Sequence, residues 1–218
     1  MTISATTQGL RPGVCTSSNR PANPFDGMVI YETDTDKVAV YDSSAWVYKT
    51  GTTAPGLVYI TQATPSAVNT VSINNCFTST YANYFIVIDL TAAVGTGIIT
   101  ARLRLSGTDA TTNYASQRVG GQATTVYAGS NVSGTDDFYF GSIEGTPAGC
   151  VWQTNLFSPA LARATVGVGT AGYPSSGGSV VEHLWNNHTT ATAYDGITVN
   201  YSGTSFTGTI RIYGYQNS

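Results

Sequence analysis

The sequence predicts an all-β protein, and three observations lead to this prediction. Short runs rich in β-branched and aromatic residues recur between turns rich in Gly, Ser and Asn. No stretch carries the 3.6-residue apolar period of an amphipathic helix. Charged residues make up only 10% of the 218 residues, whereas the chain contains 24 glycines. A surface with so few charges must be built from small polar residues and tight turns, which favours β-structure.

We expect four segments along the chain. Residues 1–24 form an extended arm, 25–48 a small β-hairpin unit, 49–56 a linker, and 57–218 an antiparallel, jelly-roll-like β-sandwich. The arm has neither a helical nor a strand period and contains three prolines, so alone it would be mobile. We expect a partner to order it, with packing on its own domain as the alternative.

The hairpin unit is the clearest local structure in the sequence. Met28–Thr33 and Val38–Asp42 are strand-like runs, and the polar residues Asp34–Lys37 between them suit a turn. A third short run, Ala45–Tyr48, follows. Both faces of this small unit carry apolar side chains, so another surface of this chain or of a second subunit should complete it. We assign assembly or anchoring to Phe25, Met28, Ile30, Tyr31, Val40, Tyr41 and Trp46.

The linker contains Gly and Pro and no apolar side chain larger than Ala. Beyond it, short strands are predicted between turn signals, as in a sandwich or jelly roll. They cover 57–61, 70–73, 84–90, 98–105, 124–127, 138–143, 151–157, 164–168, 180–185, 197–201 and 209–213.

Two of these strands can be assigned by face. In Ile98–Leu105, apolar residues alternate with Thr and Arg, which is the pattern of a half-exposed sheet. In Thr209–Tyr215, Arg211 and two tyrosines share one face. Because Tyr and Arg are enriched at interfaces, this face is a candidate contact surface, with sandwich packing as the alternative. The residues of an outward contact surface would be Trp152, Trp185, Tyr213 and Tyr215.

No constellation of residues indicates catalysis, a metal or a cofactor. His183 and His188 are the two histidines, and Glu182 lies on the strand face opposite His183, which breaks up a local ligand cluster. The acids at 136, 137 and 144, like those at 32, 34 and 36, are more simply turn formers than a catalytic pair. Nucleophile-elbow, Walker and dinucleotide-binding patterns are missing. We therefore expect no catalytic, cofactor-binding or metal-binding residues.

Composition also restricts the partners and the compartment. The net charge is −3 and the basic residues are scattered, so we expect no nucleic-acid binding. Apolar runs are too short to cross a bilayer, and the N-terminal residues lack signal-peptide features, so we expect synthesis in a cytoplasm without membrane insertion. Cys15, Cys76 and Cys150 are odd in number and far apart, which disfavours a disulfide framework; Cys76 is expected to be buried.

Residues 20–36 (RPANPFDGMVIYETDTD), followed by 40–42 (VYD) and 45–47 (AWV), resemble a module that recurs in structural proteins of tailed bacteriophages, especially minor tail and fibre-type proteins. Residues 77–84 and 208–215 are similar to the β-rich domain that often follows this module. The resemblance implies a virion component, made in the host cytoplasm, with no catalytic residues to transfer.

Together these observations lead us to expect a non-enzymatic virion structural protein. The resemblance to fibre-type proteins and the two apolar hairpin faces favour a homotrimer. Its partners would be other virion proteins, and the sequence does not separate a tail protein from a capsid decoration protein. The alternative is a receptor- or carbohydrate-binding module of the virion that recognises a host surface glycan or receptor. An envelope-degrading enzyme is the third and weakest alternative.

Overall fold

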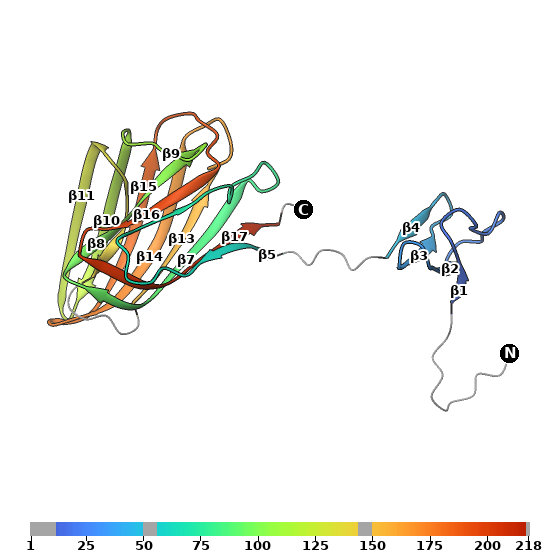
Figure 1. The fold of residues 1–218 in the computed structure, drawn as a ribbon, viewed down its shortest axis with the longest axis horizontal. Helices are drawn as coiled ribbons and strands as arrows, with labels where there is room; N and C mark the ends of the chain where they lie inside the picture. Colours follow the sequence, from blue (N-terminus) through green and yellow to red (C-terminus); the bar gives the residue numbers. More distant parts are fainter. Residues whose placement is uncertain (1–11, 50–55, 144–149, 217–218) are drawn as a thin grey trace, which may run out of the picture. The chain divides into compact units, whose positions relative to one another are not determined.

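A computed structural model describes residues 12–49, 56–143 and 150–216, and for 131–135 it describes the backbone alone. The chain divides into two compact units, Met1–Ala54 and Pro55–Ser218. The division falls within the predicted linker, whose residues 50–55 lie outside the described ones. Every regular element in the described ranges is a β-strand, so the all-β prediction is confirmed (Figure 1).

The first unit contains one four-stranded sheet in the order β1-β2-β3-β4. The predicted hairpin is present, because β2 and β3 are antiparallel neighbours joined by a turn in which Asp36 has a positive φ of 56°. At the next corner, Asp42 Oδ1 accepts hydrogen bonds from the backbone N–H groups of Ser44 (3.2 Å) and Ala45 (2.9 Å). The strands are β1 (Gly13–Cys15), β2 (Val29–Glu32), β3 (Lys37–Tyr41) and β4 (Trp46–Tyr48).

The described part of the predicted arm belongs to this sheet. β1 pairs in parallel with β2 and covers one of its edges. The Ser17 N–H then donates to Asp34 Oδ1 at 2.9 Å, and Arg20 donates to Glu32. Residues 12–24 therefore pack on their own unit, which is the alternative that the sequence left open, while residues 1–11 lie outside the described residues.

The second unit consists of an eight-stranded and a five-stranded sheet, and all strand pairs within them are antiparallel. The large sheet has the order β11-β10-β15-β14-β13-β7-β17-β5. Its strands are β5 (Leu57–Ala63), β7 (Asn83–Val94), β10 (Tyr114–Gln122), β11 (Thr125–Thr135), β13 (Cys150–Phe157), β14 (Thr165–Ser175), β15 (Gly178–His188) and β17 (Ser205–Tyr215).

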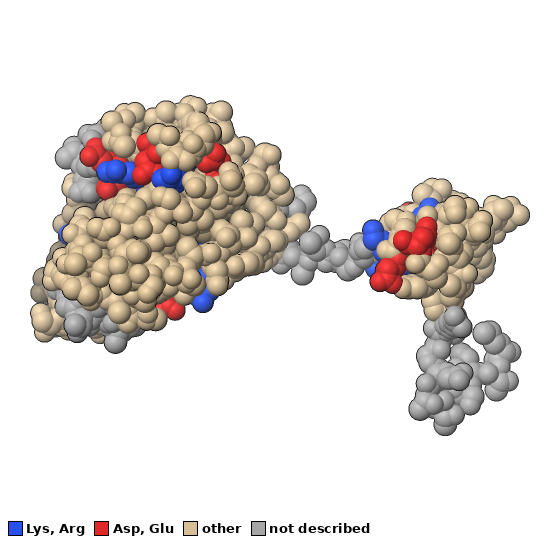
Figure 2. All heavy atoms as spheres, in the orientation of Figure 1, with Lys and Arg blue, Asp and Glu red and all other residues tan. Residues whose placement is uncertain are grey.

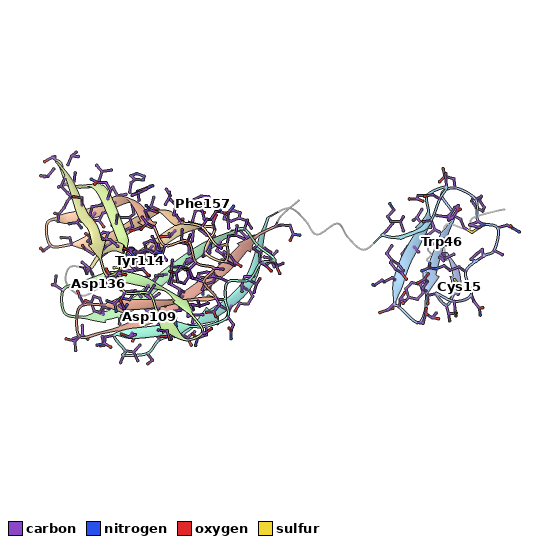
Figure 3. All side chains as sticks on the ribbon, turned by 90° about the horizontal axis from the view of Figure 1, so that it is seen from above. Cys15, Trp46, Asp109, Tyr114, Asp136 and Phe157 are labelled. Carbon is purple, nitrogen blue, oxygen red and sulfur yellow. The ribbon has the colours of Figure 1, made fainter. Side chains whose placement is uncertain are left out.

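The small sheet has the order β12-β8-β16-β6, with β9 paired to β8. Both sheets contribute to one core, so the unit has a sandwich-like architecture, and we call it the sandwich (Figure 1). In Figure 3, Tyr114 lies between the layers, with Phe157 toward one side of the unit and Asp109 toward the other. The strands are β6 (Thr70–Ile73), β8 (Gly97–Leu105), β9 (Thr108–Asp109), β12 (Phe138–Ile143) and β16 (Gly196–Tyr201).

Residues alternate between the core and the surface along most strands. Ile99, Ala101 and Leu103 of β8 are fully buried, as the sequence pattern predicts, although Leu105 at the strand end is exposed. Cys76 is buried, which confirms the expectation for that residue. The prediction that Trp152 is an outward contact is wrong: it is 1% exposed, because β13 directs even-numbered side chains into the core.

Most of the charged side chains on the drawn face of the sandwich gather in a band near β9, and most of that face is uncharged (Figure 2). Arg104 joins β8 to its neighbours there. Its Nε donates to Asn74 Oδ1 at 2.9 Å and its Nη1 donates to Ser72 Oγ at 3.0 Å and to the Asp109 carboxylate. Because these polar groups satisfy one another across β6, β8 and β9, this network stabilises the small sheet.

Candidate functional site

One face of the small sheet in the first unit is apolar and uncharged, and we call it the valine face. Residues that pair directly across adjacent strands lie on the same face of a sheet. Four of the valines on this face are between 37% and 47% exposed. A face of this kind marks a contact surface when nothing covers it. The register places on it Val14, Val29, Tyr31, Val38, Val40 and Val47.

The opposite face of this sheet buries a carboxylate. Glu32 is fully buried, and its Oε1 accepts a hydrogen bond from Arg20 Nε at 2.5 Å. Its Oε2 accepts hydrogen bonds from Tyr48 Oη at 2.9 Å and Thr35 Oγ1 at 3.0 Å. The hydrogen bond from Arg20 lowers the pKa of Glu32, against the opposing effect of burial. The ionised pair is satisfied internally, so the polar groups of this face hold the unit together.

The seven residues predicted for assembly do not form one surface. Tyr31 and Val40 lie on the valine face. Ile30 is buried on the opposite face, the face that also carries Tyr41 and Trp46, whose rings are 5.5 Å apart. Phe25 and Met28 precede β2; Phe25 is exposed, and Met28 is half-buried.

Sequence reasoning missed four members of the valine face: Val14, Val29, Val38 and Val47. The two-residue period of a strand does place Val29 on the same face as Tyr31. Val14 and Val47 lie on this face because of the register in which β1 and β4 pair with their neighbours, and the sequence does not show that register.

The second candidate surface is the face of the large sheet turned away from the small sheet, which we call the outer face. It carries three of the four predicted contact residues, Trp185, Tyr213 and Tyr215, while Trp152 points the other way. Tyr213 lies between two other rings of this face, with centroid distances of 6.0 Å to Tyr59 and 6.4 Å to Phe85. The outer face is therefore lined with aromatic side chains from β5, β17, β7 and β15.

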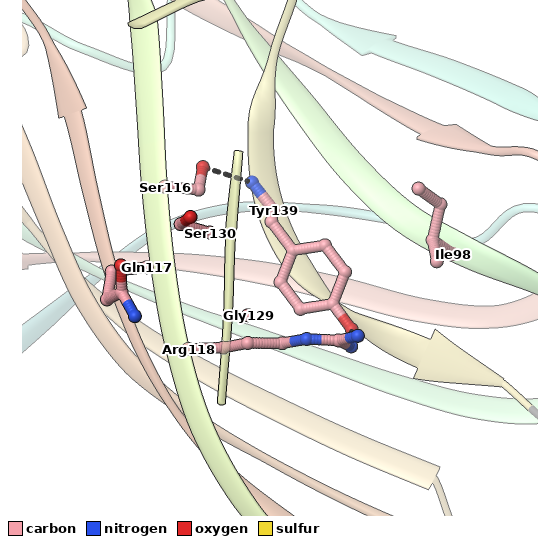
Figure 4. Close-up of a pocket in the computed structure, with 7 residues that line it drawn as sticks. All are labelled: Ile98, Ser116, Gln117, Arg118, Gly129, Ser130 and Tyr139. Carbon is pink, nitrogen blue, oxygen red and sulfur yellow. Dashed lines mark hydrogen bonds between the residues drawn. The ribbon is translucent and has the colours of Figure 1, made fainter. Parts of the chain in front are cut away.

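A cleft beside Arg118 is the third candidate. A hollow of about 220 Å³ is lined by residues of β8, β10, β11 and β12, and Arg118 extends along the Tyr139 ring, its guanidinium 4.8 Å from the ring centroid (Figure 4). Gly129 leaves room for this side chain, because a Cβ there would lie 2.9 Å from Arg118 Nε. A second hollow of about 240 Å³ also includes Arg118. Each is smaller than the roughly 300–1,000 Å³ that is usual for ligand sites.

The charged groups of this cleft satisfy one another. Glu182 is fully buried and accepts hydrogen bonds from Arg118 Nη1 at 2.9 Å, Tyr127 Oη at 2.9 Å and Tyr139 Oη at 3.2 Å. Burial and then the Glu182 carboxylate raise the pKa of Tyr127, and burial raises the pKa of Tyr139. Both hydroxyls therefore stay protonated and donate hydrogen bonds to the carboxylate, which makes the cluster a structural network.

Within the described ranges, no three His, Cys, Asp or Glu side chains are grouped so as to hold a metal ion. Glu182 is buried while His183 is exposed, so the two point to opposite faces as predicted. His188 is buried with its ring centroid 4.3 Å from that of Tyr114 and 5.3 Å from that of Tyr194. Glu144, a conceivable partner for the aspartates at 136 and 137, lies outside the described residues.

Comparison with known proteins gave no match to a family model, to a curated protein or to a solved structure. Among the described residues, the chain contains no helix long and apolar enough to cross a membrane.

Proposed function

We propose that this chain is a non-enzymatic structural protein of a tailed-bacteriophage virion. Its first unit assembles or anchors the protein, and a jelly-roll-like sandwich faces outward. The observation that carries the assembly role is the valine face, a surface of six uncharged side chains on a small sheet. The resemblance of residues 20–36, 40–42 and 45–47 to phage tail and fibre modules supports the placement in a virion.

The small core of the first unit explains why the valine face needs a partner. Among its described residues, only Ile30, Glu32 and Ala39 are buried. A unit this small buries only a small fraction of its surface, so its own core gives it little stability. Moving four half-exposed valines into an interface would stabilise each protomer by about 3 kcal/mol in total. Association through this face therefore supplies the stability that the unit cannot draw from its own core.

The assembly that we favour is a homotrimer. Three copies around a three-fold axis bring three valine faces together, and such closed symmetric arrangements are the usual form of homo-oligomers. The resemblance to fibre-type proteins points to the same state. Other virion proteins of the tail or capsid would then hold the trimer on the particle.

The double variant Val29→Glu/Val47→Glu in the full chain tests the assembly role. Because it places carboxylates in a desolvated interface, light scattering should show one third as many chains per particle as in the unchanged protein. The matched control Asn23→Glu/Ser44→Glu adds the same charge to the same unit at exposed positions off the face. It should leave the mass unchanged; equal masses for all three proteins would rule out assembly through this face.

The virion assignment has its own test. Antibodies raised against the sandwich should label purified particles of the virus that encodes the chain in electron micrographs. A regular pattern over the capsid indicates a decoration protein, and label confined to the tail indicates a tail protein. Protein found in infected cells but not on purified particles would contradict the assignment.

The outer face supports a second candidate function, a receptor- or carbohydrate-binding module. The specific observation is that Trp185, Tyr213 and Tyr215 share this face, since aromatic rings stack on sugars and anchor interfaces. If this function is correct, Trp185→Ala with Tyr213→Ala abolishes binding to host cells and leaves particle assembly intact. Unchanged host binding would exclude it.

A further inference from the structure

The outer face of the large sheet exposes large apolar side chains. Of the exposed large apolar residues described in the second unit, all but Val68 and Leu105 lie on it. Those of β10, β11, β13, β14 and β15 are Val119, Val126, Phe157, Val168, Val181 and Trp185. Monomeric soluble proteins rarely expose contiguous apolar patches beyond a few hundred Å², so a face of this composition indicates a contact surface.

The outer face also has almost no charge. In the described part of the chain, its strands present one acid, Asp89 of β7, and one base, Arg211 of β17. These two residues are diagonal neighbours on adjacent strands, because Asp89 pairs with Thr209, and Arg211, two residues further along β17, pairs with Val87. In self-pairing, the face meets a copy with the same net charge, so a face whose net charge is close to zero favours self-pairing.

The area of the face matches what a stable dimer needs. Eight strands about 4.8 Å apart, with outward residues about 6.8 Å apart along each strand, cover roughly 34 by 25 Å, or about 800 Å². A standard protein interface buries about 800 Å² per partner. The face is thus large enough to form a stable interface by itself.

We propose that two copies of this chain pair through their outer faces, sheet against sheet, about a two-fold axis. Packing one sheet on another is an ordinary way to cover alternating apolar side chains. A glycan would need convergent polar groups in a hollow, and the two hollows described above flank Arg118, whose side chain points to the inner side of β10. A charged partner would find only one residue of each sign.

This pairing does not depend on the proposed function, and its test is independent of the trimer. The double variant Val168→Glu/Val181→Glu in the full chain places two carboxylates in the paired face. Light scattering should show half as many chains per particle as in the unchanged protein. This ratio is the same whether or not the first unit also forms a trimer. The control Val68→Glu/Leu105→Glu adds the same charge at exposed apolar residues off the face and should leave the mass unchanged.

Circular dichroism and urea unfolding show whether the variants are folded. If the acidic variant does not fold, Val168→Thr/Val181→Thr keeps β-branched residues in the strands and should raise the dissociation constant of the pair at least tenfold. If the folded variant and the unchanged protein have the same mass and the same dissociation constant, the proposal is overturned. Loss of host-cell binding at unchanged mass would likewise overturn it and assign the face to a receptor.

Discussion

Gly141 and Trp152 meet at the centre of the sandwich. Gly141 has a positive φ of 141° beside an irregularity in the β12–β8 register. A Cβ at this position would lie 2.1 Å from Trp152 Nε1, on a rigid buried ring. Because strain and overpacking act together here, Gly141→Ala should lower the free energy of unfolding by about 2–4 kcal/mol, as measured by urea denaturation.

Gly172 is the control for this prediction. No atom lies within 4 Å of a Cβ built there, and its φ is not positive. Gly172→Ala should therefore change the free energy of unfolding by less than about 1 kcal/mol, and in the stabilising direction through the unfolded chain. Equal effects of the two substitutions would show that the contact between Gly141 and Trp152 is not tight.

His188 makes the sandwich sensitive to pH. Burial between Tyr114 and Tyr194 lowers its pKa below the ordinary value of 6.5. As the pH falls below 6.5, the unfolded chain takes up the proton first, so stability is complete above this pH and declines below it. The free energy of unfolding should fall by up to about 1.4 kcal/mol per pH unit until the folded histidine also protonates.

Urea unfolding at pH 7.5 and pH 5.5 measures this effect in His188→Gln and in the control His183→Gln. The first substitution should remove most of the difference between the two pH values, because no buried imidazole remains to be charged. The second should leave the difference as it is, since His183 is exposed. A difference that survives in His188→Gln would assign the pH dependence to other groups.

At the scale of elements, β10 shows how a strand can form without an apolar pattern. Its inward positions include Ser116 and Arg118, which donate hydrogen bonds to the buried Asn186 and Glu182 of β15. Ser116 Oγ and the Tyr139 N–H both donate to Asn186 Oδ1, at 2.7 and 3.0 Å, so this amide links β10 and β15 to β12. Polar pairs therefore occupy positions that apolar residues fill elsewhere in the core.

Arg118→Met tests the contribution of this strand. It leaves the buried Glu182 carboxylate without its cation and should lower the free energy of unfolding by about 2–3 kcal/mol, less than for a fully buried pair because a third of the Arg118 side chain is exposed. Arg118→Met with Glu182→Gln should recover most of the loss in urea denaturation. Arg163→Met, at an exposed arginine, serves as control and should cost less than about 1 kcal/mol. If the double variant is as unstable as Arg118→Met alone, the loss of stability does not come from the unpaired Glu182 carboxylate.

These elements show which strands a sequence can predict. β6 and β12 have the predicted bounds, because each is an apolar or β-branched run between clear turns. β10 was missed since its inward side chains are polar and it contains two glycines, and β1 and β9 are too short to show a period. The local sequence pattern predicts a strand when burial of its own apolar residues stabilises it. The pattern fails to predict a strand that is stabilised by polar partners distant in the sequence.

At the scale of the whole molecule, the two units differ in how they are stabilised. The sandwich has its own core, whereas the first unit buries three described residues and exposes the valine face. The sequence predicted two unequal β-units and an apolar hairpin, because both follow from local composition. The valine face and the outer face could not be predicted as surfaces, because each depends on the register of strands that are far apart in the chain.

The most direct test of the account compares the mass of the full-length protein with that of a chain beginning at Leu57, by light scattering. If the first unit is the trimerisation element, the full-length protein contains three times as many chains per particle as the shortened one. This ratio holds whether or not the outer faces also pair. Equal numbers of chains in the two proteins would contradict the central claim that the first unit assembles this protein.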